Sequence, residues 1–503
     1  MRGESEHFVV YADTNARTLQ RYVQKIERFD GLLRRYYPIT VDYKIPKLEI
    51  YLADGLRDMR QAWPGVSRSI GGFYSPSSGR IFAVVNTASD MGDSVLFHEY
   101  AHHFMFQMAS AAYPAWFVEG FAEYYATADV RAGHLEIGRF DKGRMLSLTQ
   151  PSNSWPPLED VLSWRVSESG RFRGADYYAF SWALTHYLLS DPGRTRALGR
   201  YLSAVAEGAS PTEALQTSLD RTPAQLQSDL RRYLSGPLQV LSPQIELPDA
   251  EVTVTRMSDA AQHLIWYDLR LDRTSPLDEA NEAEAEDEQD KDDANKIRER
   301  QLERQTLIAE SLAAANRYPD DPLAIRVKAR AQRLSGDLHG SLTSLQPLVD
   351  ESSTDAAALR IAALAELELA RDEVEAREAA KRRRSAQTYL AQALDVDPLD
   401  FRIYLALDDL RRNQPGYPNN NDLSVMEVAT TLAPQSFDGR MRYAAMLLAT
   451  SQREKAIAML TPVANSPHES GARSQARAML IQARNAPGSA PLVESRASDE
   501  VRE

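Results

Sequence analysis

The sequence predicts two folded parts: an α+β domain with a small mixed sheet at the N-terminus, and an all-α domain of helical repeats after it. At 503 residues the chain is too long for one ordinary domain. Short β-branched or aromatic runs alternate with helical patterns up to residue 240, whereas the pattern after residue 297 is helical and repeats. Between the two parts lies a strongly acidic stretch whose composition cannot form a core.

Four segments follow from these observations. They are an N-terminal domain at 1–240, a connecting segment with an acidic linker at 241–296, helical repeats at 297–485 and a disordered tail at 486–503. In the connecting segment, the proline-punctuated stretch 235–275 predicts a strand or two. Residues 276–293 carry ten acidic residues, one lysine and no aromatic residue, which is typical of a flexible or singly helical linker.

The composition excludes several kinds of site. The formal net charge of −13 argues against a nucleic-acid-binding surface, which needs a basic stripe. The chain has no cysteine, so disulfides, thiolate zinc sites and cysteine nucleophiles are excluded together. Any metal ion must therefore be held by histidine and carboxylate side chains.

The sequence also bears on membranes and compartment. No apolar run approaches the roughly 20 residues that a membrane-spanning helix needs, so no membrane span is expected. The N-terminus, MRGESEHFVVYAD, has no apolar leader core, so the sequence as written predicts a cytoplasmic protein. A strand-like FVVYA run nevertheless begins after only seven residues. This abrupt start leaves open a periplasmic or secreted protein whose leader has been removed.

Periodicity and turn residues predict the elements of the N-terminal domain. The expected strands are 8–11, 48–52 and a hairpin over 73–85 whose second strand is 81–85. Asp93 is a good N-cap for a helix. The expected helices are 14–37, 93–109, 116–129 and 175–189, with more up to 234.

The C-terminal part repeats with a nearly constant period. Pro398, Pro434 and Pro467 stand 36 and 33 residues apart, close to the period of about 34 residues of tetratricopeptide (TPR) repeats. This part resembles TPR-like helical hairpins, with an irregular helical bundle as the alternative. Either arrangement stacks helix pairs, and because TPR-like repeats are generally protein-binding surfaces, a protein partner is expected there.

The run HEYAH at residues 98–102 carries the candidate site. Positions i and i+4 of a helix share a face, so His98 and His102 can direct two imidazoles at one ion, with Glu99 about 100° round the helix beside it. This spacing is typical of two zinc ligands and a general base. The alternative is a pair of partnered histidines in a buried helix.

A catalytic zinc needs a third protein ligand, and the run PAWFVEGFAEYYATADV offers two carboxylates. Glu119 and Glu123 are four residues apart on what should be one aromatic-rich helix. Burying two carboxylates there is costly without a cation or hydrogen-bond donors. A metal ion would offset that cost.

HEYAH followed by WFVEGFAEY resembles the gluzincin zinc metallopeptidases of the peptidase MA-like superfamily, over roughly residues 5–235. The resemblance implies that Glu119 is the third ligand of Zn²⁺, after His98 and His102. It also implies that Glu123 hydrogen-bonds a zinc-bound histidine and fixes its tautomer and ring orientation.

The segment GADYYAFSWALTHYLL extends this resemblance. Many gluzincins have a tyrosine opening a helix, and its hydroxyl stabilises the oxyanion of the tetrahedral intermediate. Tyr178 fits that pattern, with Tyr177 as the second candidate, and a phenol is neutral at pH 7. The alternative is a tyrosine that only packs in a helical core.

The resemblance also suggests how substrate binds. Gluzincins take extended substrate on an edge strand, and the RIFAVV run before HEYAH is expected to be that strand. The Gly-x-Met-Glu-Asn motif, which anchors the free amine in gluzincin aminopeptidases, is missing before His98, so an endopeptidase is favoured. Of the other histidines, His103 is expected to be a surface or packing residue, and His134 and His186 stand alone.

The leading prediction is a zinc-dependent metallopeptidase that hydrolyses a protein or peptide substrate. His98, His102 and Glu119 would hold the ion. Glu99 would take a proton from the attacking water and pass it to the leaving amine, while Tyr178 would donate to the oxyanion. The alternative is a catalytically inactive gluzincin-like scaffold that acts as a TPR-type protein-interaction module.

Overall fold

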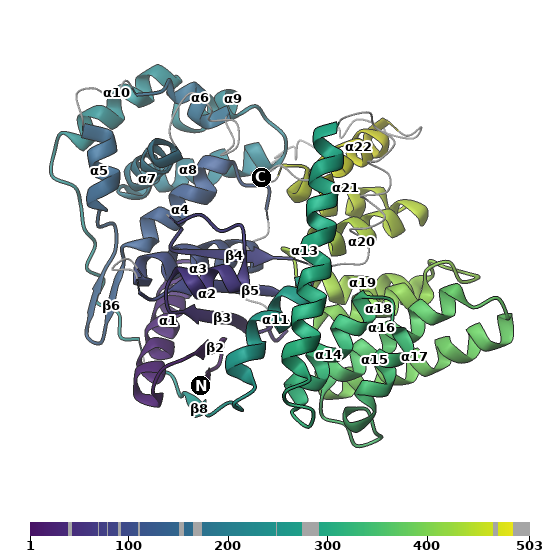
Figure 1. Ribbon diagram of the computed structural model, residues 1–503. Helices are drawn as coiled ribbons and strands as arrows, with labels where there is room; N and C mark the ends of the chain where they lie inside the picture. The colour runs from purple at the N-terminus through teal and green to yellow at the C-terminus, as the bar shows by residue number, and fades with distance from the viewer. Residues whose placement is uncertain are drawn as a thin grey trace, which may run out of the picture.

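The computed structural model shows two lobes that lie side by side (Figure 1). The N-terminal lobe contains a sheet with its covering helices, and the second lobe is helical. The described residues are 1–38, 43–68, 70–77, 79–88, 92–108, 111–149, 155–163, 174–247, 249–273, 291–465 and 471–485. Most of the predicted acidic linker, and the predicted disordered tail, lie outside these ranges.

A six-stranded mixed sheet forms the centre of the N-terminal lobe, with strand order β4-β5-β3-β2-β1-β8. The neighbours β2, β3 and β5 run parallel, whereas β4, β1 and β8 are antiparallel to the strands beside them. The strands are β1 (Arg2–Glu4), β2 (Phe8–Ala12), β3 (Leu48–Ala53), β4 (Gly72–Pro76), β5 (Ile81–Asn86) and β8 (Thr253–Thr255). The sheet is therefore small and mixed, as predicted, and the predicted hairpin is the β4–β5 pair.

The edge of the sheet differs from the prediction. The RIFAVV run forms β5, which pairs with β4 on one side and β3 on the other, so the prediction that it is an edge strand is wrong. The edge strand at this end of the sheet is β4, and β8 is the edge strand at the other end. After β3 the chain skips one strand position and returns through the hairpin, so β5 fills the position between β3 and β4.

Alternate residues of the central strands face two different helical layers. Ile50 and Val85 pack against α1 and α3 in the main core. Tyr51 and Val84, one residue away along each strand, pack on the opposite face against α2 and α11. These helices are α1 (Ala16–Tyr36), α2 (Leu56–Ala62), α3 (Gly92–Met108) and α11 (Ala261–Arg273).

A second helical layer lies beyond α3. α4 packs between α3 and α7, so residues of these three helices that are far apart in the sequence lie close together in space. The layer comprises α4 (Ala115–Ala126), α5 (Lys142–Thr149), α6 (Leu158–Ser163), α7 (Gly174–Leu189), α8 (Pro192–Ala206), α9 (Pro211–Leu219) and α10 (Pro223–Leu234), with the hairpin β6 (Asp129–Arg131) and β7 (His134–Glu136) after α4. The expected helix 116–129 ends early because the chain enters β6 at Asp129.

The predicted connecting segment contains a helix that the sequence did not suggest. Its one described strand, β8, adds to the sheet beside β1, and α11 follows. Trp266 and Leu269 of α11 pack on the sheet, whereas Leu264 and Leu271 pack against the second lobe. α11 therefore packs between the sheet and the second lobe.

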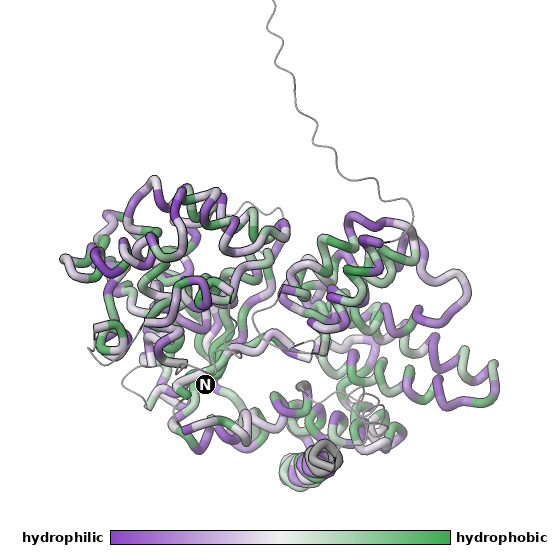
Figure 2. The backbone as a smooth tube through the Cα atoms, turned by 90° about the horizontal axis from the view of Figure 1, so that it is seen from above, coloured by the Kyte–Doolittle hydropathy of each residue, from purple (hydrophilic) through white to green (hydrophobic). Residues whose placement is uncertain are grey.

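The second lobe is a stack of helices in which each helix packs on the next, as the repeat pattern predicted. α18 and α20 begin directly after Pro398 and Pro434, whereas Pro467 lies outside the described residues. Apolar and polar stretches alternate along these helices (Figure 2). The helices are α13 (Lys291–Ala315), α14 (Pro322–Leu334), α15 (Leu338–Leu345), α16 (Ala356–Asp372), α17 (Ala376–Val396), α18 (Phe401–Arg411), α19 (Asn420–Leu432), α20 (Phe437–Ala449), α21 (Arg453–Ala464) and α22 (Gly471–Asn485).

Buried ion pairs join the two lobes around Asp272 of α11. The carboxylate of Asp272 lies 3.5 Å from Arg80 of the sheet hairpin, 3.1 Å from Arg330 of α14 and 3.3 Å from Arg402 of α18. Its side chain is only 6% exposed. Charges that are buried this deeply interact strongly, so this cluster fixes α11 against both lobes.

A second contact reaches the helix that carries HEYAH. The side-chain amide of Gln107, near the end of α3, donates to the carbonyl oxygen of Leu432 at 3.2 Å. The amide of Gln435 donates to the side-chain carbonyl oxygen of Gln107 at 2.8 Å. The turn between α19 and α20 therefore touches α3 directly.

Candidate metal centre

α3 is a buried helix, and its apolar residues fix the direction in which its histidines point. Leu96, Tyr100 and Phe104 recur every four residues and pack against the core. His98 and His102 lie on another side of the helix, toward α4, and both are half-buried. The two imidazoles therefore share a face, as the four-residue spacing predicts.

α4 supplies carboxylates from the interior of the lobe. Each of its residues from Ala115 to Ala126 is buried, including Glu119 and Glu123. Gly120 lies against α7, where a Cβ atom would overlap Thr185 Oγ1 and the carbonyl oxygen of Ser181. The glycine therefore permits a close approach of α4 and α7, which both contribute to the centre.

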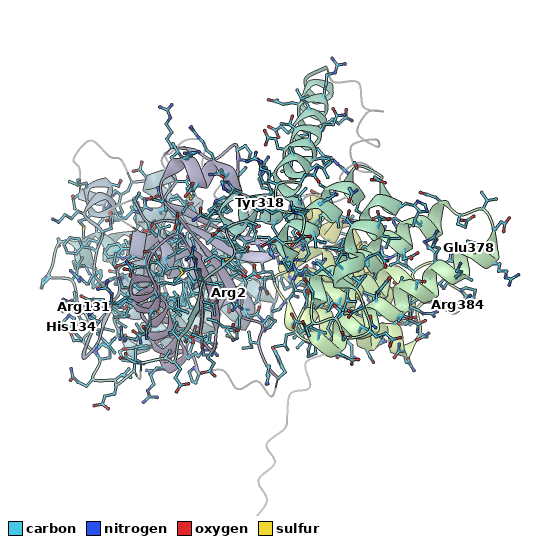
Figure 3. The ribbon with its side chains drawn as sticks, turned by 60° about the horizontal axis from the view of Figure 1, so that its bottom comes forward. Arg2, Arg131, His134, Tyr318, Glu378 and Arg384 are labelled. Carbon is cyan, nitrogen blue, oxygen red and sulfur yellow. The ribbon has the colours of Figure 1, made fainter. Side chains whose placement is uncertain are left out.

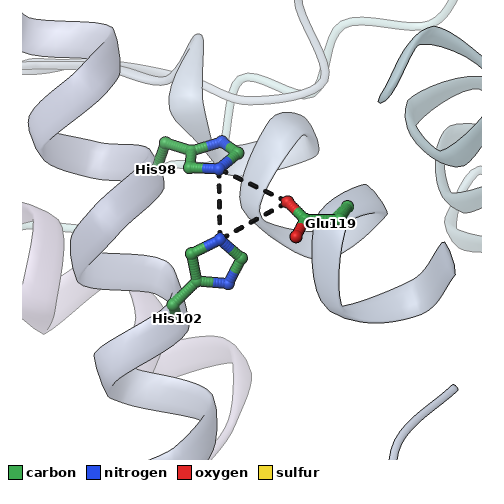
Figure 4. Close-up of side chains that lie close together, drawn as sticks. All are labelled: His98, His102 and Glu119. Carbon is green, nitrogen blue, oxygen red and sulfur yellow. Dashed lines mark hydrogen bonds and ion pairs between the residues drawn. The ribbon is translucent and has the colours of Figure 1, made fainter. Parts of the chain in front are cut away.

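The structure brings His98, His102 and Glu119 together (Figure 4). The Nε2 atoms of the two imidazoles are 3.1 Å apart. Oε2 of Glu119 lies 3.5 Å from Nε2 of His98 and 3.5 Å from Nε2 of His102. Three potential ligand atoms thus form a nearly equilateral triangle.

The triangle has the size that a zinc ion requires. With bonds of about 2.0–2.1 Å, a tetrahedral zinc separates its ligand atoms by about 3.3 Å, and the observed distances lie on either side of that value. Within the described part of the chain, the buried Oε2 of Glu119 has no hydrogen-bond partner. A buried carboxylate oxygen without a donor is costly, and a cation would remove that cost. The residues present therefore fit Zn²⁺.

The charges around His98 favour a cation at this place. Burial alone lowers the pKa of His98, but the carboxylates of Glu119, Glu123 and Glu99 outweigh it and raise the pKa to about 9. Burial raises the pKa of Glu119, but His102 and His98 outweigh it and hold that pKa well below its usual value. Glu119 is therefore a carboxylate at neutral pH, as a metal ligand must be.

Glu123 lies behind the centre and connects it to an arginine. Oε1 of Glu123 lies 3.5 Å from Nδ1 of His98, on the side of the ring away from Glu119. Arg144 donates to both oxygens of Glu123, from Nε at 2.9 Å and from Nη2 at 2.7 Å. The position of Glu123 beside His98 is the one that the resemblance implies.

Arg144 was not anticipated from the sequence. It stands in the first turn of α5, separated from α4 by the β6–β7 hairpin. No motif or spacing marks it, because its contact with Glu123 exists only when the chain has folded back across that hairpin.

Tyr178, and not Tyr177, lies beside the centre. The rings of Tyr178 and His98 meet edge to face with centroids 6.3 Å apart, whereas Tyr177 is packed in the core. The charge of Glu119, and then burial, raise the pKa of Tyr178, so its hydroxyl keeps its proton. The guanidinium of Arg144 stacks over the Tyr178 ring at 5.0 Å from its centroid.

Glu99 is half-buried on α3, and its charge acts on the residues of the candidate centre. Its charge raises the pKa of His98 and that of Tyr178. The carboxylate of Glu99 is therefore close enough to His98 and Tyr178 to act on both electrostatically.

The remaining histidines have other partners. His103 is buried and contacts the hydroxyl of Tyr74 through Nδ1 at 3.2 Å, so it is a packing residue. His134 lies in β7 at the surface beside Arg131 (Figure 3). His186 contacts the carbonyl oxygen of Gly138 at 2.9 Å and the hydroxyl of Tyr233 at 2.7 Å.

A second triad of possible ligands, His7, Glu27 and Asp30, is already paired. Nδ1 of His7 lies 2.9 Å from Glu27, and Arg34 donates to Asp30 at 2.7 Å. Because its carboxylates have donors and a cation, this group needs no metal ion.

The comparisons with known proteins match parts of the chain. Residues 94–210 match a family described as "Protein of unknown function (DUF1570)", and that segment holds every residue of the centre. No curated protein matches the chain. A solved structure of a thermophilic TPR protein from Thermus thermophilus is similar at 17% identity, over 35% of this chain and 91% of that chain, with a TM-score of 0.32.

The helical repeats of the second lobe are defined by the packing of each helix on the next. Among the helices of the described ranges, none combines the length and apolar character that a bilayer-spanning segment requires.

Proposed function

We propose that the protein is a zinc-dependent metallopeptidase of gluzincin type. The observation that carries the proposal is the triangle of His98, His102 and Glu119, whose size suits zinc. When bound, zinc would supply a Lewis acid that polarises a carbonyl and lowers the pKa of water. His98 and His102 would supply two neutral imidazole ligands and Glu119 one carboxylate ligand, a set that catalytic zinc sites commonly have.

The chain's own groups provide the proton transfers. Glu99 takes a proton from the attacking water and delivers it to the leaving amine, because its carboxylate lies on the same helix as His98 and His102. Tyr178 keeps its hydroxyl proton and donates it as a hydrogen bond to the developing oxyanion. His98 is held in place from behind by Glu123.

An extended substrate segment would bind along β4. This strand is the edge of the sheet and packs beside α3, so its outer side has main-chain donors and acceptors available for an added strand. Pro76 at its end has no N–H, which limits the pairing to the preceding residues. Binding through the main chain of an extended segment favours cleavage within a polypeptide, so we propose an endopeptidase.

The second candidate function is a catalytically inactive scaffold. A lobe of stacked helix pairs is typical of a protein-binding surface, and the family that matches residues 94–210 is described without an activity. In that case the centre would keep its shape, with or without a bound metal ion, and would not turn over.

Metal analysis and cleavage of casein separate the two candidates. The full chain is loaded with zinc, freed of excess, and compared with Glu99→Gln and with Glu207→Gln, an exposed glutamate after α8. We expect about one zinc per chain in all three, and cleavage in the wild type and Glu207→Gln only. Zinc binding without any cleavage that depends on Glu99 would reject the peptidase in favour of the scaffold, and no zinc binding would reject the metal centre.

A further inference from the structure

We propose that Arg144 is a positioning residue that holds Glu123 and Tyr178 in place at the metal centre. This inference rests on the proposed function. Arg144 contacts both residues. Its guanidinium forms a bidentate ion pair with Glu123, and the same group lies over the ring of Tyr178. One side chain therefore connects the partner of a ligand histidine to the oxyanion donor.

The chemistry of this position calls for arginine. The guanidinium is a planar fork, so Nε and Nη2 can reach the two oxygens of one carboxylate while the flat face stays available for an aromatic ring. The side chain of Glu123 is 8% exposed and that of Arg144 is 29% exposed, so the pair lies between the interior and the surface. A lysine could keep the charge but could neither form both bonds nor stack in the same way.

Arg144 is itself held firmly by α5. The backbone N–H of Arg144 donates to Oδ1 of Asp141 at 3.0 Å, which fixes the first turn of the helix. α5 packs against α7, the helix that carries Tyr178. Trp155 connects the end of α5 to α7. Its indole N–H donates to the carbonyl oxygen of Leu148, near the end of α5, at 3.1 Å, and its ring meets Phe180 of α7 edge to face.

Two consequences follow for the centre. Without Arg144, the buried carboxylate of Glu123 would lose its cation and would no longer be held 3.5 Å from Nδ1 of His98. Loss of such a partner of a zinc histidine typically lowers metal affinity by about 10–100-fold. The ring of Tyr178 would also lose a cation–π contact, so its hydroxyl would be placed less accurately.

The test measures zinc affinity, by competition with a chromophoric chelator, and kcat and KM on the same preparations. Arg144→Ala is expected to weaken zinc binding about 10-fold or more and, at saturating zinc, to lower kcat with little change in KM. Arg144→Lys should recover part of the zinc affinity but less of kcat. Arg139→Ala removes a neighbouring arginine that pairs with Asp129 and Glu136, and should change neither quantity.

Two further backgrounds make the test specific. In a Glu123→Ala background, Arg144→Ala should have no further effect on zinc affinity; in a Tyr178→Phe background, it should have no further effect on kcat at saturating zinc. Additive losses in both backgrounds, or unchanged zinc affinity and kcat in Arg144→Ala, would overturn the inference. If the wild type binds zinc but cleaves nothing, the proposed function fails, while the zinc arm still decides whether Arg144 acts through Glu123.

Discussion

Tyr178 and Tyr177 are adjacent in the sequence but have different surroundings. Successive residues of a helix point about 100° apart, so only one of the two can face α3. Tyr178 meets the ring of His98, whereas Tyr177 is 2% exposed in the core. The negative charge of Glu119 and burial keep the phenol of Tyr178 protonated, which is the form that can donate to an oxyanion.

Replacing Tyr178 with phenylalanine should slow catalysis without loss of metal. Removal of one oxyanion donor costs about 10²–10³-fold in kcat, and KM should change much less. Steady-state kinetics with a quenched fluorescent peptide would measure both constants, with zinc content determined in parallel. Tyr177→Phe is the matched control, and a larger effect at Tyr177 than at Tyr178 would contradict the assignment.

The triad of His7, Glu27 and Asp30 predicts a pH-dependent stability. Burial lowers the pKa of His7, but the bond to Glu27 and the charge of Asp30 outweigh it, so the pKa is raised above its ordinary value of 6.5. Protonated His7 therefore stabilises the fold below about pH 6.5, and this contribution is lost as the pH rises through the raised pKa. The pKa of Glu27 is lowered below 4.5: burial opposes this shift, and the bonds to His7 and Ser5 produce it, so its contribution is lost only in stronger acid.

The free energy of unfolding of wild type and His7→Gln, measured by urea denaturation from about pH 5 to pH 9, checks this sign. The difference between the two proteins should be largest near about pH 5–6 and should shrink at higher pH. A difference that grows with pH would show that His7 is buried in its neutral form.

At the residue level, the sequence could predict what local spacing controls. The four-residue spacing within HEYAH places His98 and His102 on one helix face whatever the rest of the chain does. Glu119 needed the resemblance, because its distance from the histidines depends on how α3 and α4 pack. Arg144 could not be predicted, because its partners Glu123 and Tyr178 are brought to it by the packing of separate helices.

At the level of elements, the closeness of α4 and α7 depends on a single missing side chain. Gly120 faces Ser181 and Thr185 of α7, and no room exists there for a methyl group. Because Glu119 and Tyr178 lie on these two helices, the separation of the helices sets the distance between the proposed ligand and the proposed oxyanion donor.

Gly120→Ala should therefore destabilise the protein by about 1–3 kcal/mol, the usual cost of overpacking, and should lower kcat by moving α7. The control is Gly199→Ala in α8, where a Cβ would meet no described atom within 4 Å; it should stabilise the protein by about 0.5–1 kcal/mol. Urea denaturation of both variants gives the free energies. A Gly120→Ala protein as stable as Gly199→Ala would exclude the close helix contact.

Sequence patterns predict the bounds of most strands and helices better than the order of the strands in the sheet. The strands and helices predicted for the N-terminal lobe lie within a few residues of those observed, because local periodicity and turn residues mark their ends. The position of β5 inside the sheet was mispredicted because strand order depends on crossovers, not on the composition of the strand. α11 was missed because the prolines in 235–275 led to a strand interpretation of that whole stretch.

At the scale of the whole molecule, buried charges around Asp272 join the two lobes, beside the apolar contacts of Leu264 and Leu271. Arginines from the sheet hairpin, α14 and α18 converge on this carboxylate, and a fourth, Arg360 of α16, lies 3.8 Å away. Removing one member of a buried group of ions leaves the opposite charges without compensation.

Asp272→Ala should thus destabilise the protein by about 3–5 kcal/mol. Asp259→Ala, which removes an exposed ion pair with Arg256, should cost no more than about 1 kcal/mol. Calorimetry of both variants would measure the change in stability and would show whether the lobes unfold together. A small effect at Asp272 would mean that the arginines find water or other partners when it is absent.

The double-sided helix α11 has a practical consequence for producing the N-terminal lobe separately. A chain that ends at residue 240 would lack β8 and α11, which would leave the aromatic surface around Tyr51 and Phe82 open to water, and such fragments tend to aggregate. Stopping at codon 273 would cover that surface but leave Asp272 without Arg330 and Arg402. Each truncation removes contacts that the N-terminal lobe needs, so biochemical work on the candidate metal centre requires a chain that retains its helical repeats.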